Sequence, residues 1–398
     1  MPDGLCDDWL ARRAFELGQG ELIEIGWGSA PRQIRVPLGS RCLHPPHVVA
    51  GGEAAQYVSR AIETPIGSRS LSALIRSAKR VCVLVPDETR KDVFSVIWPI
   101  LQPMLSDVDY AIGIATGKHG YIPPARGRWR HDAKAADLIF CGTTSHGTVV
   151  RYPPQVIHAD LRILLGEIRP HYFAGYSGGA KTLFPGVAGT EGIWKNHELK
   201  ASPGARLGQV DGNPCRQDME EAAALVGPSY IINLIRGNDG SVVDAVSGAV
   251  VEAHREGVHR ARPVFESIVH RRAGTVIVSD RNPVTMNLYQ ACKLLPPAGA
   301  ILKDGGRIIL AAECGAELGP VSVINEAIYR LGSIHSLPQR HEVILVSSRT
   351  QSEVEPTFAR YAESVEDCLA DCTGDDVIVL PYGGDMIPRM ASYIGGQR

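Results

Sequence analysis

The sequence lacks the features that mark membrane, secreted and nucleic-acid-binding proteins. No uncharged apolar run reaches the ~18 residues that a membrane-spanning helix needs, so no span is expected. Residues 1–13 carry Asp3, Asp7 and Asp8 and no apolar core, which argues against a secretory signal. The net charge is only −2, so no global charge favours nucleic acid or an anionic membrane surface. We therefore expect a cytoplasmic protein with a small-molecule partner, and a homo-oligomer stays open.

The cysteine pattern gives no sign of a zinc site or a disulfide framework. The nine cysteines are odd in number and scattered, and no two form a Cys-x-x-Cys pair. Cys368 and Cys372 are the closest, four residues apart, and no further Cys or His completes a zinc set. We interpret the cysteines as reduced, mostly buried thiols.

Short β-branched runs that end in polar or Gly-rich residues dominate the first part of the chain. Such unbroken apolar runs are typical of strands buried on both faces of a parallel sheet. They occupy residues 81–85, 110–114, 138–140 and 161–165. Open α/β sheets bind their ligands beyond the carboxyl ends of the strands. The polar residues that follow each run are therefore expected to form the site.

A second set of strands follows an amphipathic stretch at residues 249–272, and 398 residues exceed one ordinary core. A short hairpin is expected at residues 21–25 and 33–37. We predict an α/β protein with two α/β domains, mainly parallel sheets, a short antiparallel N-terminal hairpin and the active site in the interdomain crevice. The N-terminal domain would span residues 1–265 and the C-terminal domain residues 266–398. The second set of strands is expected at residues 275–279, 307–310, 342–346 and 376–380.

The segment richest in chemistry reads Pro170-His-Tyr-Phe-Ala-Gly-Tyr-Ser-Gly-Gly-Ala-Lys181. Glycines around a lysine make a loop whose backbone N–H groups can point at a phosphate. Residues 175–182 also come within one residue of G-x-x-x-x-G-K-[ST], the phosphate loop of NTPases. Ala180 stands where the second glycine of that motif belongs. A phosphate-loop nucleotide hydrolase is therefore kept as an alternative, with residues 276–280 imitating its magnesium strand.

The same segment resembles the lactate racemase family, whose Pro-His-x-x-Ala-Gly-[Phe/Tyr]-Ser-Gly-Gly-x-Lys motif carries the cofactor lysine. One such match would be weak, but five occur here in the order of the family. The other four are Asp87-Glu-Thr-Arg90 for Asp-x-Thr-Arg, Thr116-Gly-Lys-His119 for Thr-Gly-x-His, His197 sixteen residues after Lys181, and Tyr289-Gln-Ala-Cys-Lys293 for Tyr-Gln-x-x-Lys. Three shorter segments also look like the family: Gly212-Asn-Pro214, Ala253-His-Arg-Glu-Gly257 and Pro381-Tyr-Gly-Gly384.

The resemblance implies a nickel-pincer nucleotide, a pyridinium-3-thioamide-5-thiocarboxylic acid mononucleotide that binds nickel. Lys181 would form its covalent thioamide link, and His197 would be the protein's nickel ligand, because imidazole suits nickel. Separate biosynthetic enzymes make and load this cofactor, so the chain produced alone can lack it. Further cofactor contacts are expected from Asp87, Thr89, Ser177, Gly178, Gly179 and Gln290.

The resemblance also implies that His119 and His171 are the two catalytic bases. Racemisation needs one base on each face of a flat intermediate, and histidine has an ordinary pKa of ~6.5, suited to that task. One histidine would take the hydroxyl proton while a hydride moves to the cofactor, which leaves a 2-keto acid before the steps reverse on the other face. Arg90, Tyr289 and Lys293 would hold the substrate carboxylate.

The chain departs from the family pattern beside the reacting residues. Gly120 replaces an Arg, Ala180 replaces a frequent Arg, and Asp280-Arg-Asn-Pro283 replaces Gly-Gly-Tyr-Pro. Because the reacting residues are retained, we predict an isomerase, a racemase or epimerase of a 2-hydroxy acid other than lactate or of a sugar acid. A non-catalytic protein that binds the cofactor or nickel is a third hypothesis, and the presence of both His119 and His171 argues against it.

Overall fold

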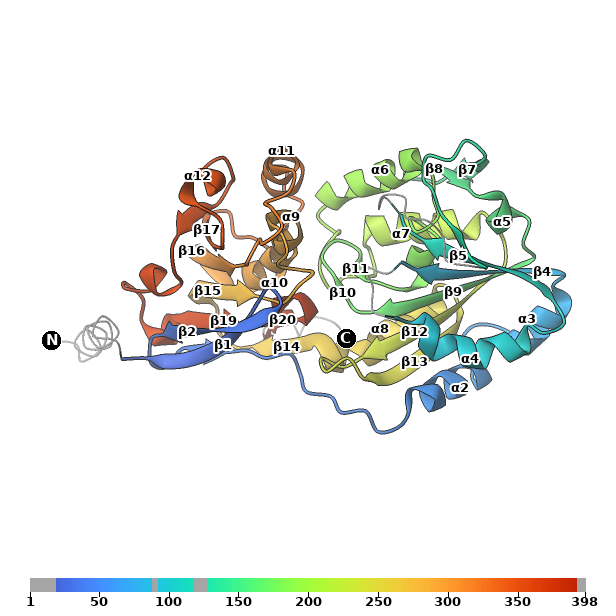
Figure 1. The fold of residues 1–398 in the computed structure, drawn as a ribbon, viewed down its shortest axis with the longest axis horizontal. Coiled ribbons are helices and arrows are strands. Elements are labelled where there is room, and N and C mark those ends of the chain that lie inside the picture. The colour runs from blue at the N-terminus through green and yellow to red at the C-terminus, as the bar shows by residue number, and fades with distance from the viewer. Residues whose placement is uncertain (1–18, 88–91, 118–126, 392–398) are drawn as a thin grey trace. The chain divides into compact units, whose positions relative to one another are not determined.

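The computed structural model describes residues 19–87, 92–117 and 127–391, and it is an α/β protein that divides into two compact units (Figure 1). The central unit holds residues 47–264, and the terminal unit joins residues 19–46 to residues 265–391. The expected division near residue 265 therefore coincides with one edge of the central unit. Residues 19–46 belong with the C-terminal part of the chain instead. No helix in the described ranges is long and apolar enough to cross a membrane.

The central unit is built on a six-stranded sheet in which only the edge strand β13 runs antiparallel to its neighbour. The first part of the chain supplies α2, α3 and α4 to one face, and later segments supply α5, α6 and α7 to the other (Figure 1). In sheet order the strands are β13 (Val242–Ala249), β12 (Ser229–Arg236), β9 (Leu161–Ile168), β4 (Arg80–Pro86), β5 (Asp109–Ala115) and β6 (Trp129–Arg130). The helices are α2 (Ala54–Glu63), α3 (Leu71–Ser77), α4 (Phe94–Met104), α5 (Pro154–Ile157), α6 (Thr190–Glu198), α7 (Pro214–Ala224) and α8 (Glu252–Phe265).

Strand β4 shows why the apolar runs read as central strands. Val81, Val83 and Val85 pack into the core on one face of the sheet, and Cys82 and Leu84 pack into the core on the other. Side chains alternate between the two faces of a strand, so a strand that is covered on both sides must be apolar throughout. Burying one such aliphatic side chain contributes about 1.5–3 kcal/mol.

The run at residues 138–140 forms a strand, but it does not join this sheet. The prediction that it lies in the parallel sheet was wrong. It forms β7 (Ile139–Thr143), which pairs only with β8 (Val149–Tyr152) in an antiparallel hairpin. Phe140 is 54% exposed, so the strand has only one covered face. Three apolar residues are too few to separate a central strand from a hairpin strand by pattern.

The terminal unit contains a second six-stranded sheet, parallel throughout. The antiparallel hairpin predicted at the N-terminus is confirmed as β1 (Glu21–Trp27) and β2 (Ala30–Val36). Its Ile25 and Ile34 pack against the sheet, and the short strand β3 adds to the sheet edge, which is why these residues belong to this unit. In sheet order the strands are β18 (Arg360–Ala362), β17 (His341–Val346), β16 (Leu302–Ala311), β15 (Ala273–Ser279), β19 (Val377–Leu380) and β3 (Arg41–Cys42).

Short helices cover the sheet of the terminal unit. A separate parallel pair of strands joins β14 (Glu266–Val269) to β20 (Ile387–Met390). The helices are α9 (Leu288–Ala291), α10 (Leu295–Ala300), α11 (Val321–Val323), a π-helix at Ile324–Arg330 and α12 (Gln351–Val354).

Candidate active site

Three adjacent strands of the central unit end in the residues singled out by sequence. Asp87 follows β4, Thr116 follows β5, and the Gly-rich segment follows β9. Because these strands are parallel, their carboxyl ends meet at one edge of the sheet. Asp87 is 7% exposed and Thr116 is 3% exposed. A hydrogen bond of 2.9 Å from the Gly117 N–H to the Gly186 carbonyl joins the loop after β5 to the segment after β9. This edge is the candidate site.

Three predicted site residues surround one buried aromatic ring, that of Phe173, which is 4% exposed. The His171 ring centroid lies 4.6 Å from it and the His197 ring centroid 5.3 Å, both in edge-to-face geometry. The Lys181 Nζ lies 5.8 Å from the centre of the same ring. His197 sits in the last turn of α6, and Lys181 sits on a one-turn 3-10 helix at Gly179–Thr182. The fold thus gathers an amine and two imidazoles around one side chain.

A second amine, which the sequence analysis missed, adjoins the same ring. The Lys200 Nζ lies 5.8 Å from the centre of the Phe173 ring. The nearby thiol of Cys215 has its pKa raised to about 12 because burial outweighs the opposing effect of the Lys181 and Lys200 charges. Two ammonium groups make this part of the site suitable for an anion. Lys200 lies three residues after His197 in the sequence. Residues three apart share one face of a helix, so this spacing could have identified Lys200.

Glycine is required in the segment between His171 and Lys181 by conformation and by packing. Strand β10 (Pro170–His171) turns back to pair with β11 (Gly175–Tyr176). Gly175 and Gly178 have φ of +75° and +77°, where side chains other than glycine are strained. A Cβ on Gly175 would also overlap the carbonyl of Gln209. These glycines are therefore explained by the loop itself and are not by themselves a sign of phosphate binding.

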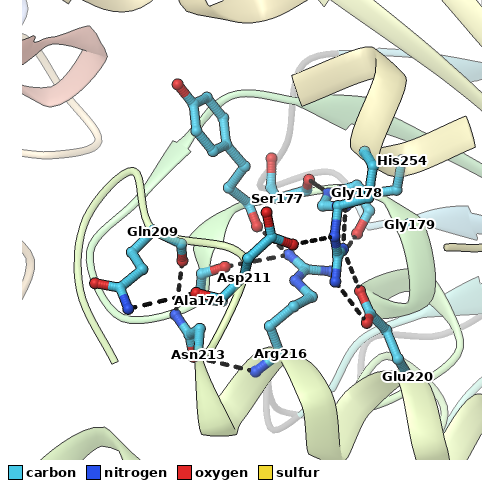
Figure 2. Close-up of polar contacts among 12 residues, drawn as sticks. Ala174, Ser177, Gly178, Gly179, Gln209, Asp211, Asn213, Arg216, Glu220 and His254 are labelled. Carbon is cyan, nitrogen blue, oxygen red and sulfur yellow. Dashed lines mark hydrogen bonds and ion pairs between the residues drawn. The ribbon is translucent and has the colours of Figure 1, made fainter. Parts of the chain in front are cut away.

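Each carbonyl from Phe173 to Gly178 accepts a hydrogen bond from the chain behind the loop, as Figure 2 shows in part. All six carbonyls are directed to the interior and hydrogen-bonded there. Contacts within the protein therefore fix the conformation of the loop. The donors are Asn213 Nδ2 to Phe173 (2.8 Å), Arg216 to Ala174 (3.4 Å), Tyr176 and Gly178 (3.1 Å), Gly208 N to Gly175 (3.1 Å), and His254 Nε2 to Ser177 (2.9 Å).

Arg216 is the centre of this network and was not identified from the sequence. Its side chain is fully buried, and burial lowers the pKa of its guanidinium to about 10. The planar fork of a guanidinium can serve several carbonyls at once, which an ammonium cannot. The carboxylate of Glu220 is paired with Arg255 at 2.7 Å, and its negative charge raises the pKa of Arg216 against the effect of burial.

Two of the predicted cofactor contacts, Ser177 and Gly179, bind the end of β9 and strand β12. The Ser177 hydroxyl donates to the Glu167 carbonyl (2.6 Å) and accepts the Arg169 N–H (3.1 Å). The Gly179 N–H donates to Asn233 Oδ1 at 2.7 Å. The Ser177 hydroxyl and the Gly179 N–H therefore hold the loop in place and do not donate to a phosphate. The segment also ends in one 3-10 turn and not in the long helix of a phosphate loop, which removes the structural basis of that alternative.

His131 is a further buried histidine that the sequence analysis missed. Its Nε2 donates to the Ala188 carbonyl at 2.9 Å, and its own carbonyl accepts the Thr116 hydroxyl at 3.0 Å. Burial lowers its pKa to about 4, so the ring is neutral at neutral pH. His131 therefore supports the end of β5 as an uncharged donor.

Tyr289, Gln290 and Lys293 lie together in the terminal unit. Tyr289 and Gln290 belong to α9, and Lys293 lies in the 3-10 turn Cys292–Leu294 that follows it. The Lys293 Nζ donates to Gln290 Oε1, and Asn287 caps α9 by accepting the Gln290 N–H at 2.9 Å. These short turns bring Gln290 and Lys293 into contact.

Residues 280–283, which depart from the family pattern, contact another loop of the terminal unit at residues 381–384. Asp280 Oδ2 accepts the Gly384 N–H at 2.7 Å. The Arg281 guanidinium lies 4.7 Å from the centre of the Tyr382 ring and donates to its hydroxyl at 3.1 Å. Asp280 and Arg281 therefore shape the Gly-rich loop at residues 381–384.

Three predicted site residues, Thr89, Arg90 and His119, lie outside the described ranges, as does Gly120 beside them. The predicted roles of the three stay predictions.

Comparison with known proteins agrees with the sequence motifs. Residues 27–208 match the model of the lactate racemase N-terminal domain. Over 391 residues the chain is 28% identical to the lactate racemase of Thermoanaerobacterium thermosaccharolyticum, covering 83% of this chain and 90% of that protein. It is 29% identical over 277 residues to the lactate racemase of Lactiplantibacillus plantarum, covering 65% of each.

Solved structures confirm the α/β fold class. The lactate racemase apoprotein from Thermoanaerobacterium thermosaccharolyticum matches with a TM-score of 0.83 and 26% identity, over 93% of this chain and 100% of that one. A protein from Thermotoga maritima matches with a TM-score of 0.61 and 16% identity, over 85% of this chain and 97% of that one. The second likeness concerns the fold alone.

Proposed function

Because the chain belongs to the lactate racemase family, we propose that it is a racemase or epimerase of a 2-hydroxy acid that uses a lysine-tethered nickel-pincer nucleotide. One observation carries the proposal: His171, Lys181 and His197 surround the ring of Phe173. The three roles that the reaction needs, a proton carrier, a covalent anchor and a metal ligand, are thereby available within one part of the central unit.

The residues present fit such a cofactor. The Lys181 amine would anchor it, and the His197 imidazole would bind its nickel. In residues 19–87, 92–117 and 127–391 no group of three or more His, Cys, Asp or Glu side chains could hold a metal ion. A nickel ion at His197 would therefore need other ligands that arrive with it, as the sulfur and carbon donors of a pincer would. When bound, the cofactor would supply an acceptor and donor of hydride.

The anionic and polar parts of the cofactor have suitable partners in the central unit. The Lys200 ammonium beside Phe173 would attract a phosphate. Asp87, which is buried directly after β4, is our candidate for the ribose hydroxyls, together with Thr89. Gly178 stays a candidate backbone contact, and Gln290 a candidate from the terminal unit. Ser177 and Gly179 would act by fixing the loop that presents Lys181.

The protein's own chemistry would be the movement of one proton. His171 and His119 would accept the proton of the 2-hydroxyl group and return it, one serving each enantiomer. Arg90, Tyr289 and Lys293 would hold the carboxylate, which keeps the carbon that inverts in a fixed position. The interactions of Asp280 and Arg281 with residues 381–384 support a substrate other than lactate, because the residues that shape this loop differ from the family pattern.

The mass of the protein made together with the cofactor-producing enzymes tests the proposal. We expect a covalent mass increase with bound nickel, and we expect Lys181→Ala to abolish the increase. A 2-hydroxy acid from a panel of larger hydroxy acids, dicarboxylic hydroxy acids and aldonates should then be racemised or epimerised. A mass increase that persists in Lys181→Ala would refute the tether, and loaded protein inactive on the whole panel would favour a non-catalytic carrier.

A further inference from the structure

The peptide group between Phe173 and Ala174 is hydrogen-bonded on both of its sides. Its N–H, from Ala174, donates to the Nδ1 of His171 at 3.3 Å. Its carbonyl, from Phe173, accepts from the Nδ2 of Asn213 at 2.8 Å. A trans peptide is planar and its N–H and C=O point in opposite directions. Fixing the carbonyl at Asn213 therefore fixes the direction of the N–H at His171.

The orientation of the Asn213 amide follows from its partners. Asn213 is fully buried, and its Oδ1 accepts the Arg216 N–H at 3.2 Å as the N-cap of α7. Its Nδ2 donates to Gln209 O at 2.9 Å as well as to Phe173 O. Turning the amide over would set its oxygen against two carbonyls and its NH₂ against an N–H donor. The side chain therefore has one satisfied arrangement, with both amide protons and the oxygen engaged.

The contact with Ala174 selects one form of the His171 ring. A nitrogen that accepts an N–H must offer a lone pair, so Nδ1 carries no proton and the neutral ring carries its proton on Nε2. We propose that Asn213 is a positioning residue that holds His171 as the Nε2–H tautomer through the Phe173–Ala174 peptide. Resting on the proposed catalytic role of His171, this adds that the neutral ring first meets the oxygen on C2 of the substrate as a hydrogen-bond donor, and that Nε2 can accept the hydroxyl proton only after its own proton has left. A neutral imidazole N–H in that position polarises a carbonyl oxygen.

Nitrogen NMR of the protein without cofactor tests the proposal directly. The protein is labelled with ¹⁵N-histidine, long-range ¹H–¹⁵N spectra are recorded at pH 8, and the His171 signals are assigned from their loss in His171→Gln. We expect Nδ1 without a proton and Nε2 with one. In Asn213→Ser the serine can still cap α7 but cannot reach the Phe173 carbonyl. We expect the ratio of the Nε2–H tautomer to the Nδ1–H tautomer to fall about tenfold in that variant, as the loss of one oriented hydrogen bond implies.

Ser70→Ala is the matched control, because Ser70 caps α3 by accepting the Ala73 N–H at 3.3 Å. It removes a cap from the same unit without touching the loop, and it should leave the His171 signals unchanged. A proton on Nδ1 in the unmodified protein would overturn the proposal, as would an unchanged tautomer in Asn213→Ser. If that variant does not fold, Asn213→Asp keeps the cap and sets an oxygen against the Phe173 carbonyl, and an unchanged tautomer there is equally fatal.

The spectra are recorded without cofactor or turnover, so their result is independent of the proposed reaction. A confirmed Nε2–H tautomer in a protein that racemises nothing would remove the proposed function and leave Asn213 as a positioning residue. Racemase activity in a protein whose His171 is the Nδ1–H tautomer would refute the proposed role of Asn213 and leave the proposed function standing.

Discussion

The Nε2–H of His254 donates to the carbonyl of Ser177 at 2.9 Å, and this joins α8 to the Gly-rich loop 77 residues earlier in the chain. The ring is fully buried, and its pKa is lowered well below the ordinary value by burial and then by the positive charge of Arg216. The neutral ring is therefore the form that binds the loop. Protonation would add a cation beside Arg216 and Arg255.

Buried histidines make the first prediction, a loss of stability in mild acid. The pKa of His131 falls from 6.5 in the unfolded chain to about 4 in the folded protein. The unfolded state therefore binds more protons between these values, so the stabilisation is complete above pH 6.5 and is lost as the pH falls towards 4. From His131 alone we expect a loss of about 2 kcal/mol in the free energy of unfolding between pH 7.5 and pH 5. His254 adds to it in the same direction.

Urea unfolding of the protein at the two pH values measures this loss. His131→Gln keeps an N–H donor for the Ala188 carbonyl but cannot titrate, so the loss between the two pH values should be smaller in that variant. An equal loss with and without His131 would show that other groups cause it.

Arg216→Lys gives the second prediction. One ammonium group cannot replace the guanidinium contacts to Ala174, Tyr176 and Gly178, so buried carbonyls lose their donors. We expect the free energy of unfolding to fall by about 2–4 kcal/mol. We also expect slower attachment of the cofactor to Lys181, followed by intact mass. Arg260→Lys, on the exposed side of α8 where Arg260 pairs with Glu256, is the control and should change neither quantity. Normal attachment in a destabilised Arg216→Lys would show that Arg216 serves the fold and not the presentation of Lys181.

Strands and motifs of this chain could be read from the sequence because they depend on local pattern. The apolar runs at residues 81–85 and 275–279 are strands at the expected places. His171, Lys181 and His197 belong to one motif region, and the structure gathers them around Phe173. The run at 138–140 failed because so short a run does not reveal how many of its faces are covered.

The network behind the loop could not be read because it is made by contacts distant in sequence. Arg216 meets the Gly178 carbonyl across 38 positions, and His254 meets Ser177 across 77. No periodicity in the sequence records such pairs. Asn213 followed by proline does indicate a helix start, but the contact of its amide with Phe173 follows only from the tertiary fold.

His197→Ala gives the third prediction, a separation of the cofactor from its metal. The tether at Lys181 remains, so the organic mass increase should persist, while nickel per protein should fall at least about tenfold because its protein ligand is gone. Inductively coupled plasma mass spectrometry measures the nickel. The exposed His158→Ala is the control and should retain it. Equal nickel in all three proteins would exclude His197 from the coordination sphere.

Lys200→Met tests the anion site beside Phe173. Replacing the ammonium by an apolar side chain of similar length should weaken binding of nicotinic acid mononucleotide, a pyridinium mononucleotide, about tenfold at low salt. Added salt should narrow the difference, because the interaction is between charges. Calorimetric titration measures the affinities. Lys195→Met removes a lysine that pairs with Glu198 on the surface of α6, and it should bind as the unmodified protein does. Identical affinity in Lys200→Met would remove Lys200 from the site.

The fate of the hydrogen on C2 distinguishes hydride transfer from simple proton exchange. In the proposed reaction this hydrogen leaves and returns as a hydride that never meets water, whereas the hydroxyl proton is exchanged through His171 and His119. Substrate deuterated at C2 should therefore keep its label through many turnovers. His171→Gln should slow both directions about 10²–10⁴-fold, because every turnover needs both bases. Mass spectrometry of substrate recovered during racemisation in D₂O measures the exchange. Rapid uptake of solvent deuterium at C2 would mean that a histidine removes that hydrogen as a proton, and the hydride mechanism would then fail for this protein.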